Sequence, residues 1–162
     1  MDQHFYTLNL TETNMSKPVT LFSKIIEGEI PCFEIARGDN WLSFLDINPR
    51  RSGHTLVIPN EPVKHLAELS SKQLSDLWFG VVETQSYLSK YFHTSDFLIG
   101  IHDGSNAGQE IPHVHVHVIP RTKGDGGKTL LACWPNTPGI GVLEPDFEAL
   151  GLLQKKIKGA NN

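Results

Sequence analysis

The sequence predicts an α+β protein with a mostly antiparallel sheet of about five strands, a short N-terminal helix, one long helix and a C-terminal helical extension. Two observations carry this prediction. Apolar residues recur at helical spacing in three segments, and short runs of strand-forming residues lie between the first two segments and after the second. Histidine and valine alternate strictly over residues 113–118, which is the period of a strand.

The composition limits the kind of protein and partner. The chain has 162 residues, of which 39% are hydrophobic, enough for one compact domain with a core. A formal net charge of −4 argues against nucleic-acid binding through a broad basic surface, although a small phosphorylated ligand needs only a local electropositive pocket. No run of residues resembles a membrane span or the apolar part of a signal peptide. We therefore expect a cytoplasmic protein without a membrane or nucleic-acid partner.

Three regions are expected along the chain. Residues 1–17 lack apolar periodicity and are predicted to be a disordered tail, and Met15 is a second plausible translation start. Residues 18–124 form the predicted domain. The composition then becomes linker-like, and residues 125–162 are predicted to be an extension that carries a helix over 147–158.

The first half of the domain combines one helix with three strands. Apolar residues at helical spacing predict a short amphipathic helix over residues 21–29. Residues 32–36 and 41–47 are typical of two strands, and the turn-forming residues between them predict a hairpin. A third strand is predicted over 54–59, and it opens with His54 at a loop edge, where functional residues often lie.

A long helix is predicted over residues 70–92, because Ser70 followed by Gln73 matches a capping box before an amphipathic run. Its predicted core side is formed by Leu74, Leu77, Trp78, Val81 and Leu88. Residues 97–102 are predicted to form a fourth strand. A loop of small residues over 103–110 then leads into the segment that alternates histidine with valine.

The alternating segment over residues 113–120 is where a functional site is predicted. In an extended strand, His113, His115 and His117, called here the histidine row, point to one face and the intervening valines to the other. The valine face suits a core, whereas a row of imidazoles adds little to packing and therefore predicts chemistry. Either one histidine is a nucleophile or general base whose neighbours position a substrate, or the row binds a metal.

Geometry disfavours metal binding by the whole row. The outer two imidazoles start about 13 Å apart on a strand, too far to converge on one ion. Two of them together with His54 remain an alternative set of zinc ligands. No cysteine pair or acid-rich segment lies beside the row. We therefore predict no metal and no other cofactor.

Two further features suggest a phosphorylated ligand. Small residues before the row, Gly108 among them, let backbone N–H groups approach an anion, and the Gln109 amide adds a donor. Asp46, at the end of a predicted strand, has a carboxylate able to accept both hydroxyls of a ribose, although Asp in such a position more often serves a turn. Next to the histidine row, these features suggest a phosphate held over a nucleophile.

Five motifs in the same order resemble the histidine triad (HIT) family of nucleotide hydrolases and transferases, over roughly residues 20–122. Residues 113–119 match the triad motif itself, His-φ-His-φ-His-φ-φ with apolar φ. The other four motifs are found at residues 21–31, 44–49, 54–59 and 108–109. The resemblance implies a HIT-like fold. It also implies an AMP-like purine nucleotide as ligand and a homodimer whose sheets join across the interface.

The resemblance also implies a reaction at the α-phosphate of a nucleoside phosphoramidate or a dinucleoside polyphosphate. In this reaction His115 attacks phosphorus and a nucleotidyl-histidine intermediate forms. His117 would contact the phosphate or leaving group, while His113 and His54 would orient the nucleophile and handle protons. The nucleotide-binding residues that the resemblance implies are Phe22, Ile25, Phe44, Asp46, Ile47, His102, Gly108, Gln109 and Glu110.

The sequence departs from the family pattern at two positions. His102 stands where Hint-like members carry Asn and Fhit-like members carry Gln, and Glu110 stands where Ser or Thr usually follows the Gly-Gln pair. A carboxylate near a phosphate repels it unless it points away or is protonated. Two alternative functions stay open: a nucleotide-binding scaffold whose slow turnover is incidental, and a zinc-dependent hydrolase.

Overall fold

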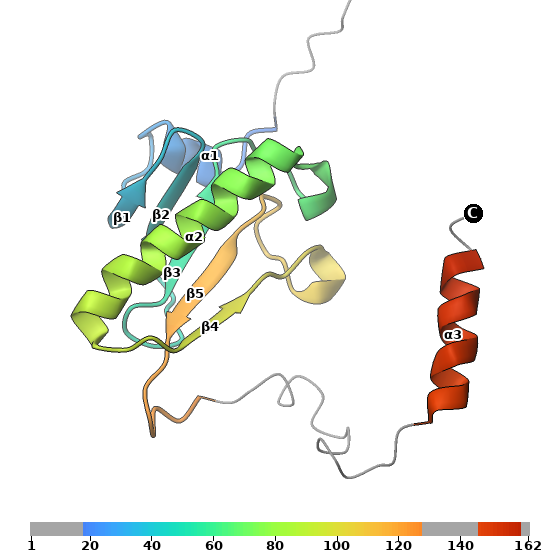
Figure 1. Cartoon of the computed structure of the whole chain (residues 1–162). Coiled ribbons are helices and arrows are strands. Elements are labelled where there is room, and N and C mark those ends of the chain that lie inside the picture. The colour runs from blue at the N-terminus through green and yellow to red at the C-terminus, as the bar shows by residue number, and fades with distance from the viewer. Residues whose placement is uncertain (1–17, 128–145, 160–162) are drawn as a thin grey trace, which may run out of the picture. The chain divides into compact units, whose positions relative to one another are not determined.

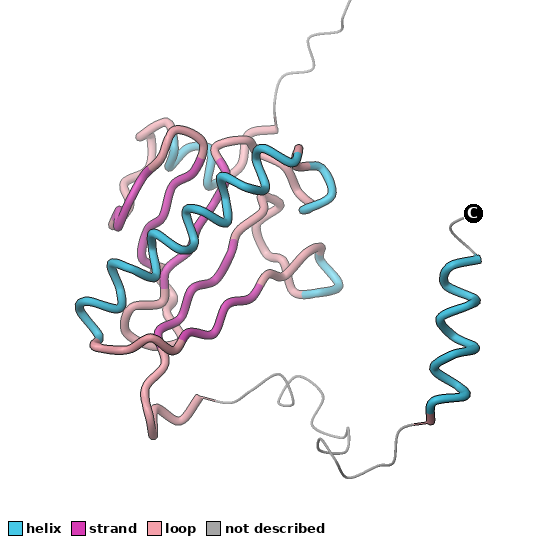
Figure 2. The backbone as a smooth tube through the Cα atoms, viewed as in Figure 1, coloured by secondary structure: helices cyan, strands magenta, loops and turns pink. Residues whose placement is uncertain are grey.

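The computed structural model describes residues 18–127 and 146–159. The chain divides after Lys123 into two units, and each is described by itself. The second unit contains helix α3 (Phe147–Gly159), so the predicted C-terminal helix is present. The predicted tail over residues 1–17 lies outside the described ranges. Figure 2 distinguishes the helices, strands and loops along the backbone.

The first unit is built on one five-stranded sheet with the strand order β1-β2-β3-β5-β4 (Figure 1). All four neighbouring pairs are antiparallel, which confirms the predicted α+β architecture. The first two strands form the predicted hairpin. The strands are β1 (Glu34–Arg37), β2 (Trp41–Leu45), β3 (Thr55–Pro59), β4 (Phe97–Gly100) and β5 (Val116–Pro120).

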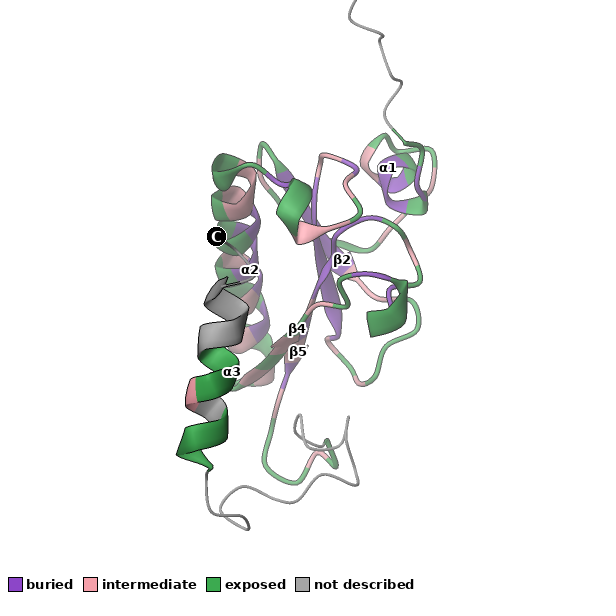
Figure 3. Cartoon of the chain, turned by 90° about the vertical axis from the view of Figure 1, so that its right-hand side faces the viewer, coloured by how far each residue is buried: buried purple, intermediate pink, exposed green. Residues whose placement is uncertain are grey.

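Helix α2 (Ser71–Phe92) covers one face of this sheet (Figures 1 and 3). It begins with the predicted capping box, in which Ser70 Oγ accepts from the Gln73 backbone and Gln73 Oε1 accepts from the Ser70 backbone at 2.8 Å. It ends at His93, whose φ of 52° lies in the left-handed region that closes many helices. The buried side of α2 consists of Leu77, Gly80, Val81, Thr84 and Leu88.

One predicted core residue of α2 faces solvent instead. Trp78 is 45% exposed, because with 3.6 residues per turn it lies about 100° around the helix from Leu77. The large ring in this core is Trp41 of β2. A Cβ atom at Gly80 would lie 2.5 Å from the Trp41 ring, so only glycine at this position lets α2 approach the sheet so closely.

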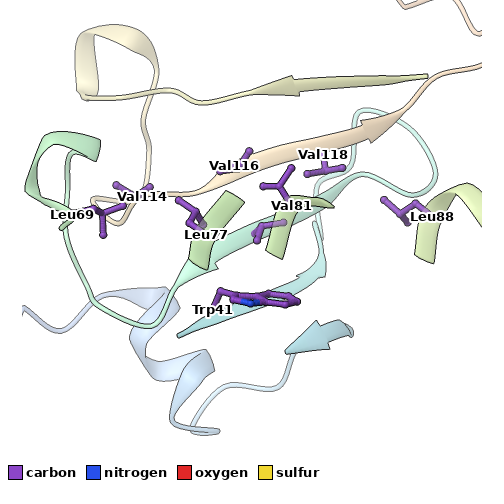
Figure 4. Packing of buried hydrophobic residues seen from close by; sticks show 9 residues of the cluster. Trp41, Leu69, Leu77, Val81, Leu88, Val114, Val116 and Val118 are labelled. Atoms are coloured by element: carbon purple, nitrogen blue, oxygen red, sulfur yellow. The ribbon is translucent and has the colours of Figure 1, made fainter. Parts of the chain in front are cut away.

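The valines of the alternating segment form the centre of the core under α2. Val114, Val116 and Val118 are fully buried there (Figure 4). The regular strand is shorter than predicted, however, because β5 begins only at Val116. Before it, the N–H of Val114 donates to the carbonyl oxygen of Val63, 2.7 Å away in a loop, instead of to a neighbouring strand. The first two histidines of the row therefore precede the strand.

The opposite face of the sheet is covered by the short helix α1 (Leu21–Ile26), which lies across the sheet from α2 in Figure 3. Thr20 caps this helix by accepting from the Ser23 backbone at 3.0 Å. The cluster of buried side chains on this face consists of Phe22, Ile25, Leu42, Phe44, Leu56 and Ile58. Two 3₁₀ turns complete the unit, η1 (Leu66–Glu68) and η2 (Ser105–Ala107). No helix within the described ranges has the length and apolar character needed to span a membrane.

Candidate active site

The first histidine of the row is held at both ring nitrogens. His113 is fully buried, with Nε2 2.9 Å from the carbonyl oxygen of Pro59 and Nδ1 2.8 Å from Oγ1 of Thr20. A carbonyl only accepts, so Nε2–H donates to Pro59 and Nδ1 accepts from the Thr20 hydroxyl. Burial lowers the pKa of His113, which keeps the ring neutral near pH 7. Its two nitrogens are thus engaged by the protein.

The second histidine of the row, His115, has one ring nitrogen in a hydrogen bond and the other free of one within the described residues. Nδ1 of His115 lies 2.7 Å from the backbone carbonyl oxygen of His113, so Nδ1–H donates and the lone pair is on Nε2. Within the described residues, no hydrogen bond engages this Nε2 atom. Burial is the main cause of the lowered pKa of His115, so the ring is neutral near pH 7. A neutral imidazole with a free, oriented lone pair is a competent nucleophile.

The third histidine of the row, His117, forms a hydrogen bond with His54, which directly precedes β3. Nε2 of His54 lies 2.9 Å from Nδ1 of His117, and Nδ1 of His54 lies 3.2 Å from the backbone nitrogen of Arg50. Because the Arg50 N–H donates to His54, His54 must donate in turn to Nδ1 of His117. The proton of His117 is then on Nε2. That buried atom has no hydrogen-bond partner within the described residues.

Both of these rings are neutral near pH 7. Burial lowers the pKa of His117 to about 4, with further lowering by the neighbouring imidazoles of His115 and His54. Burial also lowers the pKa of His54, against an opposing effect of Asp46, whose Oδ2 lies 3.5 Å from Nδ1 of His54. The site therefore presents two neutral groups side by side: the lone pair on Nε2 of His115 and the unpartnered N–H on Nε2 of His117. Their ring centroids are 5.0 Å apart.

His102 lies at the exposed side of the same group of rings. Its centroid is 5.2 Å from that of His117. Its neighbour Asp103 accepts from His65 at 3.0 Å and so is engaged with the segment before η1. We call the four rings of His54, His102, His115 and His117 the imidazole cluster.

The loop before the row is held by Gln109. Its Nε2 donates to the carbonyl oxygen of Lys64 at 2.8 Å, while its buried Oε1 has no partner within the described ranges. One of the two amide N–H donors that the sequence suggests for a phosphate is therefore committed to the protein. Gly108 has a φ of +93°, a conformation that suits glycine. Glu110 is exposed to solvent.

The predicted nucleotide-binding residues near β2 divide into buried and exposed groups. Phe22, Ile25 and Phe44 belong to the cluster under α1, and the Phe22 ring meets His115 edge-on with centroids 5.3 Å apart. Ile47 is 78% exposed. Oδ1 of Asp46 accepts from the Asn48 backbone at 2.8 Å, so this carboxylate caps a turn with one oxygen and faces His54 with the other.

Among the residues that the structure describes, one group has ligand atoms close enough to share a metal ion. The metal-ligating atoms of Asp46, His54 and His117 all lie within 4.8 Å of one another. This set contains one member of the histidine row, not the two considered from the sequence. It is weakened as a metal site because its two imidazoles already bond to each other, and both would have to turn toward an ion.

Sequence reasoning missed the backbone and hydroxyl groups that orient the rings. Thr20 is recognisable in the sequence as a helix cap, but its contact with His113 joins residues 93 positions apart. The carbonyl of Pro59 and the N–H of Arg50 give no signal in the sequence at all. These groups decide which nitrogen of each histidine is free.

The fold and the site together define a protein in which β5 and its lead-in segment carry a histidine triad, whose second and third members belong to the imidazole cluster. The chain belongs to the HIT family, because the model of the HIT domain matches residues 27–124.

Two relatives and one solved structure illustrate the similarity. The adenosine 5′-monophosphoramidase HNT1 of Saccharomyces cerevisiae is 34% identical, over 91% of this chain and 89% of the relative. The asymmetrical bis(5′-nucleosyl)-tetraphosphatase of Schizosaccharomyces pombe is 46% identical, over 51% of this chain and 46% of the relative. The structure of a histidine triad nucleotide-binding protein from Candida albicans superposes with a TM-score of 0.70 at 30% identity, covering 88% of this chain and 96% of that one.

Proposed function

We propose that this protein is a nucleotide hydrolase or transferase that acts at the α-phosphate of a nucleoside phosphoramidate or a dinucleoside polyphosphate. One observation carries the proposal: the free lone pair on Nε2 of His115 lies beside the unpartnered, buried N–H of His117. A nucleophile and a hydrogen-bond donor for an anionic oxygen are the two groups that nucleotidyl transfer needs.

In the first step, Nε2 of His115 attacks the α-phosphorus. A P–N bond forms, the bond from phosphorus to the leaving group breaks, and its electron pair stays with the leaving group. A nitrogen leaving group also takes up a proton from solvent and departs as an amine. The Nδ1–H bond from His115 to the His113 carbonyl stabilises the charge that develops on the ring. Nε2–H of His117 donates to a phosphate oxygen. In the second step, water attacks phosphorus and releases a proton to solvent, the P–N bond breaks, and its electron pair returns to Nε2 of His115.

The remaining nucleotide contacts are proposed from the family resemblance and the placement of the residues. Asp46 and the exposed Ile47 would contact the ribose, and the backbone around Gly108 would line the phosphates together with Gln109 and Glu110. Phe22, Ile25 and Phe44 would form the apolar wall for the base together with Ile47. A purine nucleotide fits the substrates named for the yeast relative, an adenosine monophosphoramidase.

We also propose that the protein is a homodimer. Within the described residues, β4 is the last strand of the sheet, so one of its edges has no neighbouring strand. Leu98 of β4 is 37% exposed. Pairing of β4 with its copy would cover the free edge and this apolar side chain together.

The test of the reaction is to trap the intermediate. Protein is mixed with an adenosine phosphoramidate or with a diadenosine polyphosphate, quenched without acid and digested. Mass spectrometry with fragmentation then locates any nucleotidyl group. We expect the adduct on His115. An adduct on His113, whose nitrogens are both engaged, would contradict the proposed roles.

A matched pair of variants completes the test. His115→Asn should lower turnover by several powers of ten while nucleotide binding survives, because the binding contacts lie elsewhere. His93→Asn is the control, since His93 lies at the end of α2 and Asn tolerates its left-handed backbone. Full turnover in His115→Asn would exclude nucleophilic catalysis by this residue. If wild type also forms no adduct with either substrate, the scaffold alternative is favoured.

A further inference from the structure

We propose that His65 is a positioning residue that holds the loop over residues 103–110 in the conformation that binds the phosphates of the substrate. The inference rests on the proposed function, which assigns phosphate contacts to this loop. His65 lies outside the histidine row and the imidazole cluster, and it acts on the substrate through the loop alone.

Two contacts hold the inner end of the loop and the start of the row to the segment that follows β3. The carbonyl oxygen of Val63 accepts from the N–H of Val114 at 2.7 Å. The carbonyl oxygen of Lys64 accepts from Nε2 of Gln109, a buried residue, at 2.8 Å. Both acceptors are backbone groups, so these contacts do not depend on which side chains residues 63 and 64 carry.

His65, the next residue of the same segment, contacts the outer end of the loop. Its Nδ1–H donates to Oδ1 of Asp103 at 3.0 Å, because the carboxylate accepts. The same oxygen accepts from the Leu66 backbone at 3.4 Å. The His65 ring also lies close to the loop backbone, since a Cβ atom placed on Gly104 would lie 3.2 Å from Cε1 of His65. His65 therefore holds this end of the loop by a hydrogen bond and by packing.

Hydrogen bonds within the loop make it one unit between these attachments. The carbonyl oxygen of Gly104 accepts from the N–H groups of Ala107 and Gln109 at 3.0 and 3.1 Å. The N–H of Gly108 donates to the carbonyl oxygen of Ser105 at 3.0 Å. Because the loop is bonded internally in this way, fixing its two ends determines where its backbone lies relative to the histidine row.

Of these attachments, the one from His65 to Asp103 is the bond between two side chains. The two side chains are 39% and 38% exposed, so water competes for their hydrogen bond. The Nδ1–H group is present in the cationic ring and in one neutral tautomer, so the bond does not require a charge on His65. We therefore expect loss of this bond to loosen the outer part of the loop while the inner end stays attached.

The first test compares His65→Leu with His65→Asn in the full chain. Leucine removes the donor, whereas the amide nitrogen of asparagine takes the place of Nδ1 and can still donate to Asp103. For His65→Leu, we expect the Kd of AMP and the KM for an adenosine phosphoramidate to rise about three- to tenfold, with kcat within about twofold of wild type. His65→Asn should restore both values. Equal losses in the two variants, or a fall in kcat with unchanged KM, would overturn the role of His65.

Variants of Asp103 show whether the hydrogen bond or the charge matters. Asp103→Asn keeps Oδ1 as an acceptor but removes the negative charge, so the Kd of AMP should stay near the wild-type value. Asp103→Leu breaks the bond, and adding His65→Leu to it should cause little further loss, because both changes remove the same contact. Additive losses in the double variant, or a loss in Asp103→Asn as large as in His65→Leu, would contradict the positioning role.

Hydrogen exchange separates failure of this inference from failure of the proposed function, because it needs no substrate. Peptides that cover residues 103–110 should exchange faster in His65→Leu than in wild type or His65→Asn. Lys72→Leu is the matched control, since it removes another exposed side-chain contact, the 2.7 Å bond from Lys72 to Asp76 on α2, and should leave loop exchange unchanged. Unchanged loop exchange in His65→Leu would refute the role of His65 even if the nucleotidyl adduct on His115 is found. Absence of that adduct with both substrates would instead refute the proposed function, and with it the phosphate contacts of the loop.

Discussion

Nε2 of His54 lies 2.9 Å from Nδ1 of His117, so a histidine outside the triad sets the orientation and tautomer of its third member. The chain of donors runs from the Arg50 backbone through His54 to His117, and it leaves the buried Nε2–H of His117 without a partner within the described residues. The ring centroids of His115 and His117 are 5.0 Å apart. This arrangement assigns His54 a positioning role toward His117, whereas the sequence resemblance left its partner open.

Replacing His54 should therefore impair the transition state more than substrate binding. His54→Phe keeps the ring size but removes both nitrogens, so His117 loses the acceptor bond that fixes its tautomer. We expect kcat to fall about ten- to a thousandfold with little change in KM, as for loss of an oriented hydrogen-bond donor. Steady-state kinetics measure both parameters. A rise in KM with unchanged kcat would show that His54 serves binding alone.

The hydroxyl of Thr20 should matter for stability. Thr20→Val removes the partner of the buried Nδ1 of His113 and the cap of α1, and each loss costs about 1–2 kcal/mol. Thr20→Ser keeps both hydrogen bonds and should lose much less. Thr84→Val is a second control, because the Thr84 hydroxyl donates to the carbonyl oxygen of Gly80 within the same helix. Denaturant unfolding measures the change in the free energy of unfolding for each of these three variants. Equal losses in Thr20→Val and Thr20→Ser would show that the methyl group, not the hydroxyl, carries the effect.

Stability should decrease as the pH falls below about 6.5. Burial lowers the pKa values of His54, His113, His115 and His117 in the fold from the ordinary histidine value of about 6.5. The unfolded chain therefore binds more protons than the native state below this pH, and protonation favours unfolding. The loss should continue toward the folded pKa, which is about 4 for His117. Chemical denaturation at pH 7.5, 6.5 and 5.5 measures this loss of stability.

A variant separates the histidine effect from acid denaturation by carboxylates. His117→Asn removes one group with a lowered pKa, so its free energy of unfolding should decline less between pH 6.5 and 5.5 than that of wild type. Identical slopes for the two proteins would mean that His117 does not contribute to the pH dependence.

A chelator should leave turnover intact. The mechanism proposed here uses the lone pair of His115 and the N–H of His117, and the ring nitrogens that join His54 to His117 are already bonded to each other. Activity is assayed after dialysis against EDTA and again after zinc is restored. Loss of activity in EDTA and its recovery with zinc would support the zinc-dependent alternative. Asp46, His54 and His117 would then be the ligands to examine.

A charge at the free edge of the sheet should separate the proposed dimer. Leu98→Lys places a cation on β4, where pairing with a second copy would bury it. Light scattering after size exclusion should show a mass near twice 18.0 kDa for wild type and a lower mass for the variant. Phe33→Lys, on the exposed segment before β1, is the matched control and should not change the mass. A monomeric wild type would refute the dimer.

The strand and helix patterns predicted the fold well because they report local periodicity. The alternation over 113–118 correctly assigned the valines to the core. The helical pattern of α2 was less specific. Leu77 and Trp78 are consecutive, and only the position of the sheet decides that the buried stripe is centred on Leu77 and excludes Trp78.

The contacts of the site could not be read from the sequence, because they join segments that the sheet brings together. His54 and His117 are 63 residues apart, and they meet because β3 and β5 are neighbours. Sequence patterns identified the histidines themselves. Which nitrogen each one leaves free depends on single backbone groups, and these carry no residue-type signal.

The order of strands in the sheet also bears on how the protein folds. β5 is flanked by β3 and β4. Before this strand, the His113 ring bonds to Thr20 and Pro59, and within it the His117 ring bonds to His54. Such pairings close long loops, whose entropic cost slows folding relative to local helix formation. During refolding, the helical signal of α2 should therefore return before nucleotide binding does. An excised peptide that contains only the triad would lack Thr20, Pro59 and His54, whose groups orient the first and third histidines.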